Sequence, residues 1–131
     1  MTLEEYLRTE EFSEVKREFH DGEVLAMSGG TTRHARLTSS VNAMLYNRLR
    51  RGPCAAYDSN ARVATTETRR FVYPDATIVC GEIQYHPSDK KKTTITNPRA
   101  IFEVLSDSTE SYDRGEKFLQ YGQITSLEEY V

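Results

Sequence analysis

The chain lacks any long apolar run, and this absence limits the class of protein to which it can belong. Of its 131 residues, 37% are hydrophobic and 28% are charged, and no stretch approaches the roughly 20 apolar residues of a membrane span. The N-terminus lacks the basic start and the apolar core of a secretory signal peptide. We therefore expect one soluble, cytoplasmic domain over residues 1–131 that does not bind membranes.

Cysteine is scarce as well, since Cys54 and Cys80 are the only two in the chain. Two cysteines and three scattered histidines match no zinc-ligand spacing, which argues against a zinc module. Both cysteines lie in apolar surroundings, so the sequence favours buried free thiols over a disulfide.

Acidic residues are missing from one long segment, although the net charge of the chain is −3. Residues 1–23 carry eight acids and three bases, whereas residues 24–57 carry no acid at all. This second segment could therefore bind nucleic-acid phosphate. The alternative is a solvated helix face whose charges pair with the acidic N-terminus. The basic residues of the segment are Arg33, Arg36, Arg48, Arg50 and Arg51.

The N-terminal part of the chain carries signals for a helix and then a hairpin. The segment 2–5 has the spacing of a capping box, which predicts a short helix with apolar residues inside. Asp21-Gly22 is the two-residue hairpin signal, because both turn positions require positive φ. Alternation then places one set of polar side chains on the same face of the hairpin: Glu18, His20 and Glu23.

A longer helix is predicted after the turn at 28–32. Thr31 or Thr32 can cap its start, and Gly52-Pro53 ends it. Apolar residues recur at steps of three and four, which predicts an inner stripe that begins with a histidine. The stripe comprises His34, Leu37, Val41, Met44 or Leu45, and Leu49.

The rest of the chain alternates between apolar segments and polar connections, so the predicted fold class is α/β. Apolar residues resume at 127–131 without a polar tail, which predicts a further strand and indicates that C-terminal strands are missing. The expected elements are short strands at 54–57 and 61–64 (or one strand with a break at 58–60), strands at 71–80 and 100–106, a polar hairpin connection at 65–70, a polar loop at 81–97 and a helix at 113–121.

Two of the predicted strands each contain a carboxylate within an apolar run. Asp75 lies in the strand at 71–80 and Glu103 in the strand at 100–106. An ionised acid in such a place is costly unless it is paired, protonated or bound to a cation. If the strands are neighbours, both acids could bind one magnesium or manganese ion. The alternative for Asp75 is that it only caps a turn after Pro74 or forms a hydrogen bond within it. The alternative for Glu103 is a buried ion pair with an arginine.

Six ordered motifs carry a family resemblance: Asp21-Gly22-Glu23, Met27-Ser28-Gly29, Arg33-His34-Ala35, Tyr73-Pro74-Asp75, Glu103-Val104-Leu105-Ser106 and Tyr112-Asp113-Arg114-Gly115-Glu116-Lys117. Over residues 3–131 the chain resembles the Uma-two family of bacterial restriction endonucleases, which belongs to the PD-(D/E)XK nuclease superfamily. The resemblance implies a restriction endonuclease-like fold with a mixed central sheet flanked by helices. It also implies further strands after residue 131.

The resemblance also implies roles for single residues. Pro74-Asp75 matches the PD element and Glu103 the acid that follows it, and these two would hold Mg²⁺ or Mn²⁺ with the carbonyl of Val104. The superfamily lysine would stand at position 105, where this chain has Leu105. The resemblance implies that the family's lysine has moved to the next helix, where Lys117 of this chain is the matching residue.

Three further assignments have structural alternatives. Lys117 lies four residues after Asp113, so the two could form an exposed helix ion pair instead of a catalytic arrangement. His34, expected to act in catalysis, could be a core histidine with one hydrogen bond. Glu18 and Glu23 could each supply a ligand or an orienting hydrogen bond from the hairpin, or they could be surface strand residues. Glu18 is the better candidate, because it lies deeper in the hairpin than Glu23, which is next to the turn.

The function that these observations favour is metal-dependent hydrolysis of DNA phosphodiester bonds by an endonuclease. One alternative is a catalytically silent nucleic-acid-binding or regulatory domain that keeps the fold. A second alternative is a carboxylate-metal hydrolase that acts on a smaller phosphate ester. The sequence leaves the oligomeric state open, and a homodimer is one possibility.

Overall fold

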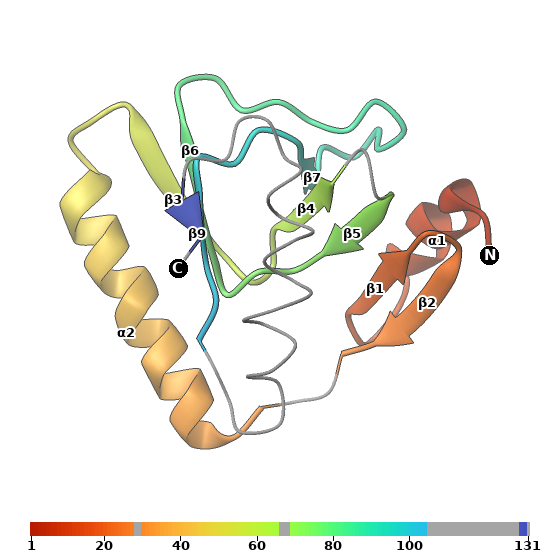
Figure 1. Ribbon diagram of the computed structural model, residues 1–131, viewed down its shortest axis with the longest axis horizontal. Helices are drawn as coiled ribbons and strands as arrows, with labels where there is room; N and C mark the ends of the chain where they lie inside the picture. Colours follow the sequence, from red (N-terminus) through yellow and green to blue (C-terminus); the bar gives the residue numbers. More distant parts are fainter. Residues whose placement is uncertain (28–29, 66–68, 105–128, 131) are drawn as a thin grey trace.

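Figure 1 shows the computed structural model, which describes residues 1–27, 30–65, 69–104 and 129–130. The architecture is mixed α/β, as the sequence predicts, and the described strands form two sheets. The described elements are α1 (Leu3–Glu10), β1 (Arg17–His20), β2 (Glu23–Ala26), α2 (Thr32–Leu49), β3 (Cys54–Asp58), β4 (Arg62–Thr65), β5 (Arg70–Val72), β6 (Ala76–Cys80), β7 (Thr94–Ile95), β8 (Ala100–Phe102) and β9 (Glu129–Tyr130).

The two sheets lie between the two helices. Sheet A has the strand order β2-β1-β5-β4-β7, and sheet B has the order β3-β6-β8-β9. Helix α1 packs against β1 of sheet A, whereas α2 packs against β3 and β6 of sheet B. Consequently α1 and α2 lie on opposite sides of the molecule (Figure 1). Neither described helix has the length and apolarity that crossing a membrane requires.

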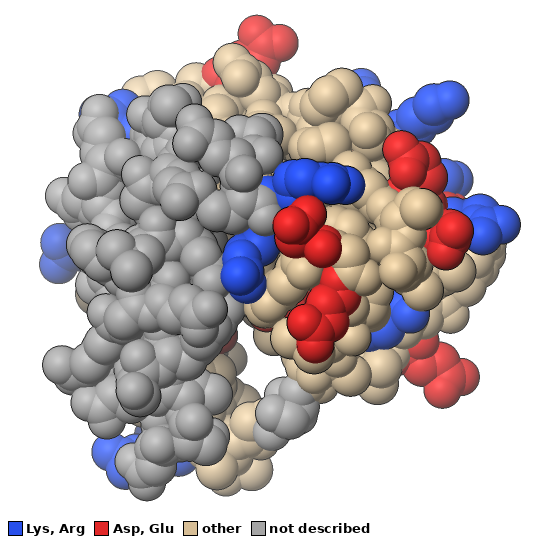
Figure 2. Space-filling view, turned by 45° about the vertical axis from the view of Figure 1, so that its right-hand side comes forward, with Lys and Arg blue, Asp and Glu red and all other residues tan. Residues whose placement is uncertain are grey.

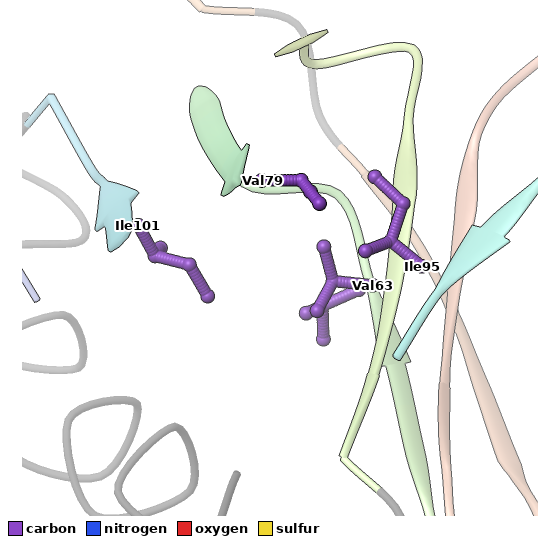
Figure 3. Close-up of a cluster of buried hydrophobic side chains, with 5 residues drawn as sticks. Val63, Val79, Ile95 and Ile101 are labelled. Carbon is purple, nitrogen blue, oxygen red and sulfur yellow. The ribbon is translucent and has the colours of Figure 1, made fainter. Parts of the chain in front are cut away.

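The main core fills the space between the sheets. Figure 3 shows Val79 and Ile101 of sheet B facing Val63 and Ile95 of sheet A. All four side chains are 2% exposed or less. Burial of each such side chain stabilises the fold by about 1.5–3 kcal/mol. These contacts therefore fix how one sheet sits on the other.

The predicted N-terminal helix and hairpin are both confirmed. The side chain of Thr2 caps α1 by accepting a hydrogen bond from the backbone N–H of Glu5. In the hairpin His20 is opposite Glu23, and Asp21 and Gly22 both have positive φ. A second apolar cluster joins α1 to the outer face of sheet A through Tyr6, Phe19, Ala64 and Phe71.

Helix α2 begins after the N-cap residue Thr31, as predicted, but its inner stripe differs from the expected one. Leu37 and Met44 are 44% and 48% exposed, whereas Leu45 is buried. The side chains that face the protein recur at steps of three and four, and three of them are polar. They are His34, Thr38, Val41, Asn42, Leu45 and Leu49. The apolar spacing therefore predicted part of the buried face of this helix and missed its polar residues.

The predicted strand at 71–80 is wrong as one element. It divides into β5 in sheet A and β6 in sheet B, with Tyr73, Pro74 and Asp75 between them. Pro74 has no N–H group to give to a strand ladder, which explains why the chain leaves one sheet at this point. Asp75 therefore lies at the crossover between the sheets and not inside a strand.

The predicted polar loop at 81–97 also contains a core strand. Strand β7 pairs in parallel with β4 and buries Ile95 between the sheets. The loop before β7 supplies Asp89, which forms a buried ion pair with Arg62 at 3.2 Å. The Arg62 guanidinium also contacts the hydroxyl group of Tyr73 at 3.3 Å. Burial, together with a hydrogen bond to Glu10, raises the pKa of Tyr73 to about 12.

Cys54 and Cys80 form a disulfide between β3 and β6, so the expectation of free thiols is wrong. The two residues are direct partners in the antiparallel register of these strands. Direct partners on adjacent strands hold their side chains close together, whatever their separation along the chain. The sequence carries no local signal for this register.

The C-terminal predictions are tested only in part. Strand β8 is shorter than predicted, because it ends at Phe102, one residue before Glu103. The expected strand at 127–131 agrees with β9, which pairs in parallel with β8. The predicted helix at 113–121 lies outside the described residues.

Candidate active site

The candidate site lies where β6 begins and β8 ends. These strands are antiparallel neighbours, and Ala76 is opposite Phe102. One further step along this register places Asp75 opposite Glu103. The structure therefore meets the condition that the sequence left open, because the two acid-bearing segments lie side by side. Glu103 itself is half-buried.

Asp75 is held in place by the chain that leaves β8. Its Oδ2 atom accepts a hydrogen bond from the backbone N–H of Val104 at 2.6 Å. The Asp75 side chain is 15% exposed. A carboxylate that accepts a backbone N–H bond in such a setting has a defined orientation.

His34 completes a small cluster around the Val104 peptide. Its Nε2 atom lies 3.0 Å from the carbonyl oxygen of Val104 and 3.5 Å from Oδ2 of Asp75. A carbonyl oxygen can only accept a hydrogen bond, so this contact requires the proton on Nε2. Both polar groups around Val104 are thus engaged, its N–H by Asp75 and its C=O by His34.

The position of His34 follows from the start of α2. Its backbone N–H donates to the hydroxyl group of Thr31, which places the imidazole in the first turn of the helix. Gly30 precedes the cap and passes close to the ring. A Cβ atom on Gly30 would lie 3.1 Å from Nδ1 of His34. Glycine therefore leaves room for the imidazole.

Asn42 is a site residue that the sequence reasoning missed. Its Nδ2 atom donates to the backbone carbonyl oxygens of Thr38 and Asp75, at 3.0 and 3.1 Å. The available signal was the helical spacing, because residues 34, 38 and 42 share one face of α2 and all are polar. Polar residues in a stripe that packs on a sheet require partners.

Glu18 belongs to a second polar cluster, on sheet A. It is 9% exposed, whereas Glu23 is exposed. Its Oε1 atom lies 3.0 Å from Nε2 of His20, and Nδ1 of His20 lies 2.9 Å from the guanidinium of Arg70. Since arginine only donates, Nδ1 must accept, and Nε2 carries the proton toward Glu18.

The orientation of Glu18 follows from strand alternation. Phe19 belongs to the cluster on the α1 side of sheet A. Adjacent strand residues point to opposite faces, so Glu18 lies on the face that is turned toward sheet B. One further step along the β1–β5 register would place it beside Val72, which belongs to the core between the sheets.

The predicted metal ligands remain a prediction. Among the described residues, no group of three or more His, Cys, Asp or Glu side chains is arranged to hold a metal ion. A site here would therefore combine Asp75 and Glu103 with a backbone oxygen, as expected for Val104. Lys117 lies outside the described residues.

The charged side chains differ between the two sides of the molecule. Figure 2 shows acidic side chains, with Lys and Arg side chains between them, on the side that carries α1 and the β1–β2 hairpin. The five arginines of the basic segment are exposed on and after α2, on the opposite side. Within the part of the chain that the structure describes, none of them forms an ion pair with an N-terminal acid. This observation disfavours the alternative of charge pairing with the N-terminus.

Comparisons with known proteins identify relatives of similar sequence and a solved structure of similar fold. The chain is 36% identical to the uncharacterised protein slr1290 of Synechocystis, over all of this chain and 67% of the relative. It is 32% identical to the uncharacterised Synechocystis protein sll1609, over all of this chain and 73% of that relative. A crystal structure described as a putative nuclease belonging to DUF820, from Anabaena variabilis, superposes with a TM-score of 0.68.

That solved structure shares 13% sequence identity with this chain, and the match covers 89% of this chain and 68% of the other. At this identity the likeness shows a common fold. The model of one protein family, Uma2, described as "Putative restriction endonuclease", matches residues 3–131. The match includes every residue of the candidate site, from Glu18 to Val104. The chain therefore belongs to the Uma2 family.

Proposed function

We propose that this chain is a metal-dependent endonuclease that hydrolyses DNA phosphodiester bonds. The observation that carries the proposal is the cluster at the crossover between the sheets. There the Asp75 carboxylate, the Val104 peptide and the His34 imidazole lie within hydrogen-bonding reach of one another, beside Glu103. The family and the solved neighbour supply the nuclease assignment.

The residues at this point fit a hard divalent cation. Asp75 and Glu103 offer carboxylate oxygens, and Val104 offers a carbonyl oxygen, which are the donors that magnesium and manganese prefer. His34 uses one lone pair of the Val104 carbonyl, which leaves the second lone pair for a ligand. A bound magnesium ion would supply an activated water molecule and stabilisation of the phosphate charge.

The other residues would orient these donors. His34 would hold the Val104 carbonyl, while the Val104 N–H holds Oδ2 of Asp75. Glu18, whose carboxylate is oriented by His20, would supply a ligand or an orienting hydrogen bond from the sheet A side of the crossover. We propose Lys117 as the cation that replaces the superfamily lysine, because position 105 is leucine. The PD-(D/E)XK assignment rests on Asp75 and Glu103 together with this displaced lysine.

The basic segment supports DNA as the substrate. With 3.6 residues per turn, Arg33, Arg36 and Arg48 fall on one side of α2, within about 120° of one another. Arg50 and Arg51 follow the end of the helix. All five are exposed, and His34 of the candidate site belongs to the first turn of the same helix. A DNA strand bound at the site could therefore continue along these arginines.

DNA as a substrate implies a cytoplasmic protein in a bacterial cell. The cytoplasm keeps most thiols reduced, so the Cys54–Cys80 disulfide would be open to reduction there. The pair lies at the end of β6 that is distant from Asp75 along the strand. We therefore expect cleavage to proceed with these cysteines reduced.

Plasmid cleavage and manganese binding test the proposal together. The wild type should cut plasmid DNA in magnesium, and calorimetry should detect manganese binding without DNA. Asp75→Asn should abolish both. Asp58→Asn changes an exposed acid on β3 and serves as the matched control, with no expected effect on either property. Equal manganese binding by wild type and Asp75→Asn would contradict the proposed metal site.

A silent nucleic-acid-binding domain is the second candidate, and Leu105 favours it. This candidate expects salt-dependent DNA binding by the wild type without cleavage in magnesium or manganese. The same plasmid assay, combined with a binding measurement, separates the two functions.

A further inference from the structure

Asn42 connects helix α2 to the backbone of Asp75. Its side-chain Nδ2 lies 3.1 Å from the Asp75 carbonyl oxygen and 3.0 Å from the carbonyl oxygen of Thr38, one turn earlier in the helix. The contact joins residues that are 33 positions apart in the chain. It is a direct hydrogen bond between α2 and the crossover segment.

The chemistry of the two acceptors dictates the orientation of this amide. Both partners of Asn42 are carbonyl oxygens, which cannot donate. If the amide were turned over, its own oxygen would face two oxygens, so the NH₂ group must point at them. The NH₂ group has two hydrogens, and the two carbonyl oxygens accept one each. Removal of the NH₂ group would therefore leave the Asp75 carbonyl without this donor.

Two hydrogen bonds consequently hold Asp75, one at its side chain and one at its backbone. Its carboxylate is fixed by the backbone N–H of Val104, and its backbone carbonyl is fixed by Asn42. Pro74 immediately before it is buried, with a restricted φ. Together these restraints define where the carboxylate can point, because both ends of the residue are anchored.

We infer that Asn42 is a positioning residue for the candidate metal site, which sets the affinity for a divalent cation by anchoring the backbone of Asp75. This inference rests on the proposed function. Hydrogen-bond partners that orient metal ligands typically contribute about 10- to 100-fold in metal affinity. Asn42 acts on the backbone of a ligand, so we expect the lower end of that range, about tenfold.

The experiment measures manganese affinity by calorimetry, without DNA, in four proteins. Asn42→Leu keeps a similar side-chain size and removes both donors. Asn47→Leu makes the same change at an exposed position of the same helix and is the matched control. Leu49→Ala lowers stability from the half-buried side of α2 without removing a contact to Asp75. Wild type completes the set.

The inference expects Asn42→Leu to weaken manganese binding about tenfold, while Asn47→Leu and Leu49→Ala bind as wild type does. Thermal unfolding of all variants separates stability from affinity. If Leu49→Ala and Asn42→Leu lose the same stability and the same affinity, Asn42 is only structural, and the inference is overturned. Unchanged affinity in Asn42→Leu overturns it as well.

Asn42→Ser provides a second variant in case Asn42→Leu does not fold. It leaves space for a water molecule at the Asp75 carbonyl, and we expect its affinity to lie between those of wild type and Asn42→Leu. Wild-type affinity in Asn42→Ser would count against the inference. If the wild type itself binds no manganese, the proposed metal site fails first, which distinguishes the two failures.

Discussion

The backbone N–H of Val104 donates to Oδ2 of Asp75 at 2.6 Å, although the two residues are 29 positions apart. This bond ties the segment that follows β8 to the residue that precedes β6, and an acidic residue lies at each of these points, Glu103 and Asp75. His34 reaches the same peptide from α2, through its contact with the Val104 carbonyl at 3.0 Å. Three separate parts of the chain thus meet at one peptide group.

Removal of the His34 imidazole should weaken metal binding at the Val104 peptide. We expect His34→Ala to reduce manganese affinity about 10- to 100-fold, because the Val104 carbonyl loses the donor that orients it. His34→Gln keeps an N–H donor on a side chain of similar reach, so it should recover part of the affinity. Calorimetry measures both variants. Equal losses in the two variants would show that donation to Val104 is not the property that matters.

Gly30→Ala should displace the same imidazole by crowding. The added Cβ would lie 3.1 Å from Nδ1 of His34, closer than ordinary contact. Plasmid cleavage should therefore fall, with little change in helix content by circular dichroism. Gly52→Ala is the control, because its nearest neighbour is the Leu49 carbonyl oxygen at 3.8 Å. Full cleavage by Gly30→Ala would mean that the ring can shift at no cost to activity.

Arg48, in the last turn of α2, and Arg51, just after the helix, should contribute to the salt dependence of DNA binding. We expect Arg48→Ala combined with Arg51→Ala to weaken binding and to reduce the slope of log affinity against log salt by up to about 1.8, which is about 0.9 for each lost phosphate contact. Fluorescence anisotropy at several salt concentrations measures the slope.

The matched control for this pair removes two exposed bases away from α2, Arg8 of α1 and Lys90 of the loop before β7. It makes the same change in net charge and should leave the slope close to that of wild type. If both double variants change the slope equally, the effect reflects net charge and not contacts along α2.

Asp89 should contribute to stability in a pH-dependent way. Burial raises the pKa of Asp89, but hydrogen bonds from Thr93 and Thr94 and the Arg62 charge outweigh it and hold the pKa below its ordinary value. Its folded pKa is therefore lower than its unfolded pKa. The contribution is complete at pH values above the unfolded pKa, about 3.9, and it is lost as the pH falls through the folded pKa.

Asp89→Asn should accordingly lower the free energy of unfolding by about 3–5 kcal/mol at pH 7, because Arg62 keeps a buried charge without its partner. Urea unfolding at pH 7 and near pH 3 measures the change, and the difference from wild type should shrink at the lower pH. Asp21→Asn, which breaks an exposed ion pair with Arg69, is the control and should change little. A difference that stays the same at both pH values would contradict this account.

Local features of the fold could be predicted because neighbouring residues decide them. The cap of α1 joins Thr2 to Glu5, and the hairpin depends on the positive φ of Asp21 and Gly22. The start of α2 depends in the same way on Thr31 and its bond to His34. In each case the hydrogen bond or the dihedral involves residues within three positions. Such interactions are present in the sequence itself.

The candidate site could be predicted only in its residue types. Asp75 and Glu103 stood out because acids interrupt apolar runs, but their proximity depends on the pairing of β6 with β8. Asn42 carried only the weaker signal of its helical spacing with His34 and Thr38, which does not identify its partner. Its bond to Asp75 spans two elements that only the packed structure brings together.

The sequence by itself determined the helix caps, the hairpin register, the separation of acidic and basic segments, and the acids available to the site. Tertiary structure alone decided that the run 71–80 divides between two sheets, that Cys54 meets Cys80, and that Leu37 stays exposed while Thr38 faces the protein. The physical reason is the distance along the chain over which each kind of interaction acts. Capping and turn formation act over a few residues, whereas strand pairing and helix packing depend on contacts between segments that are distant in the chain.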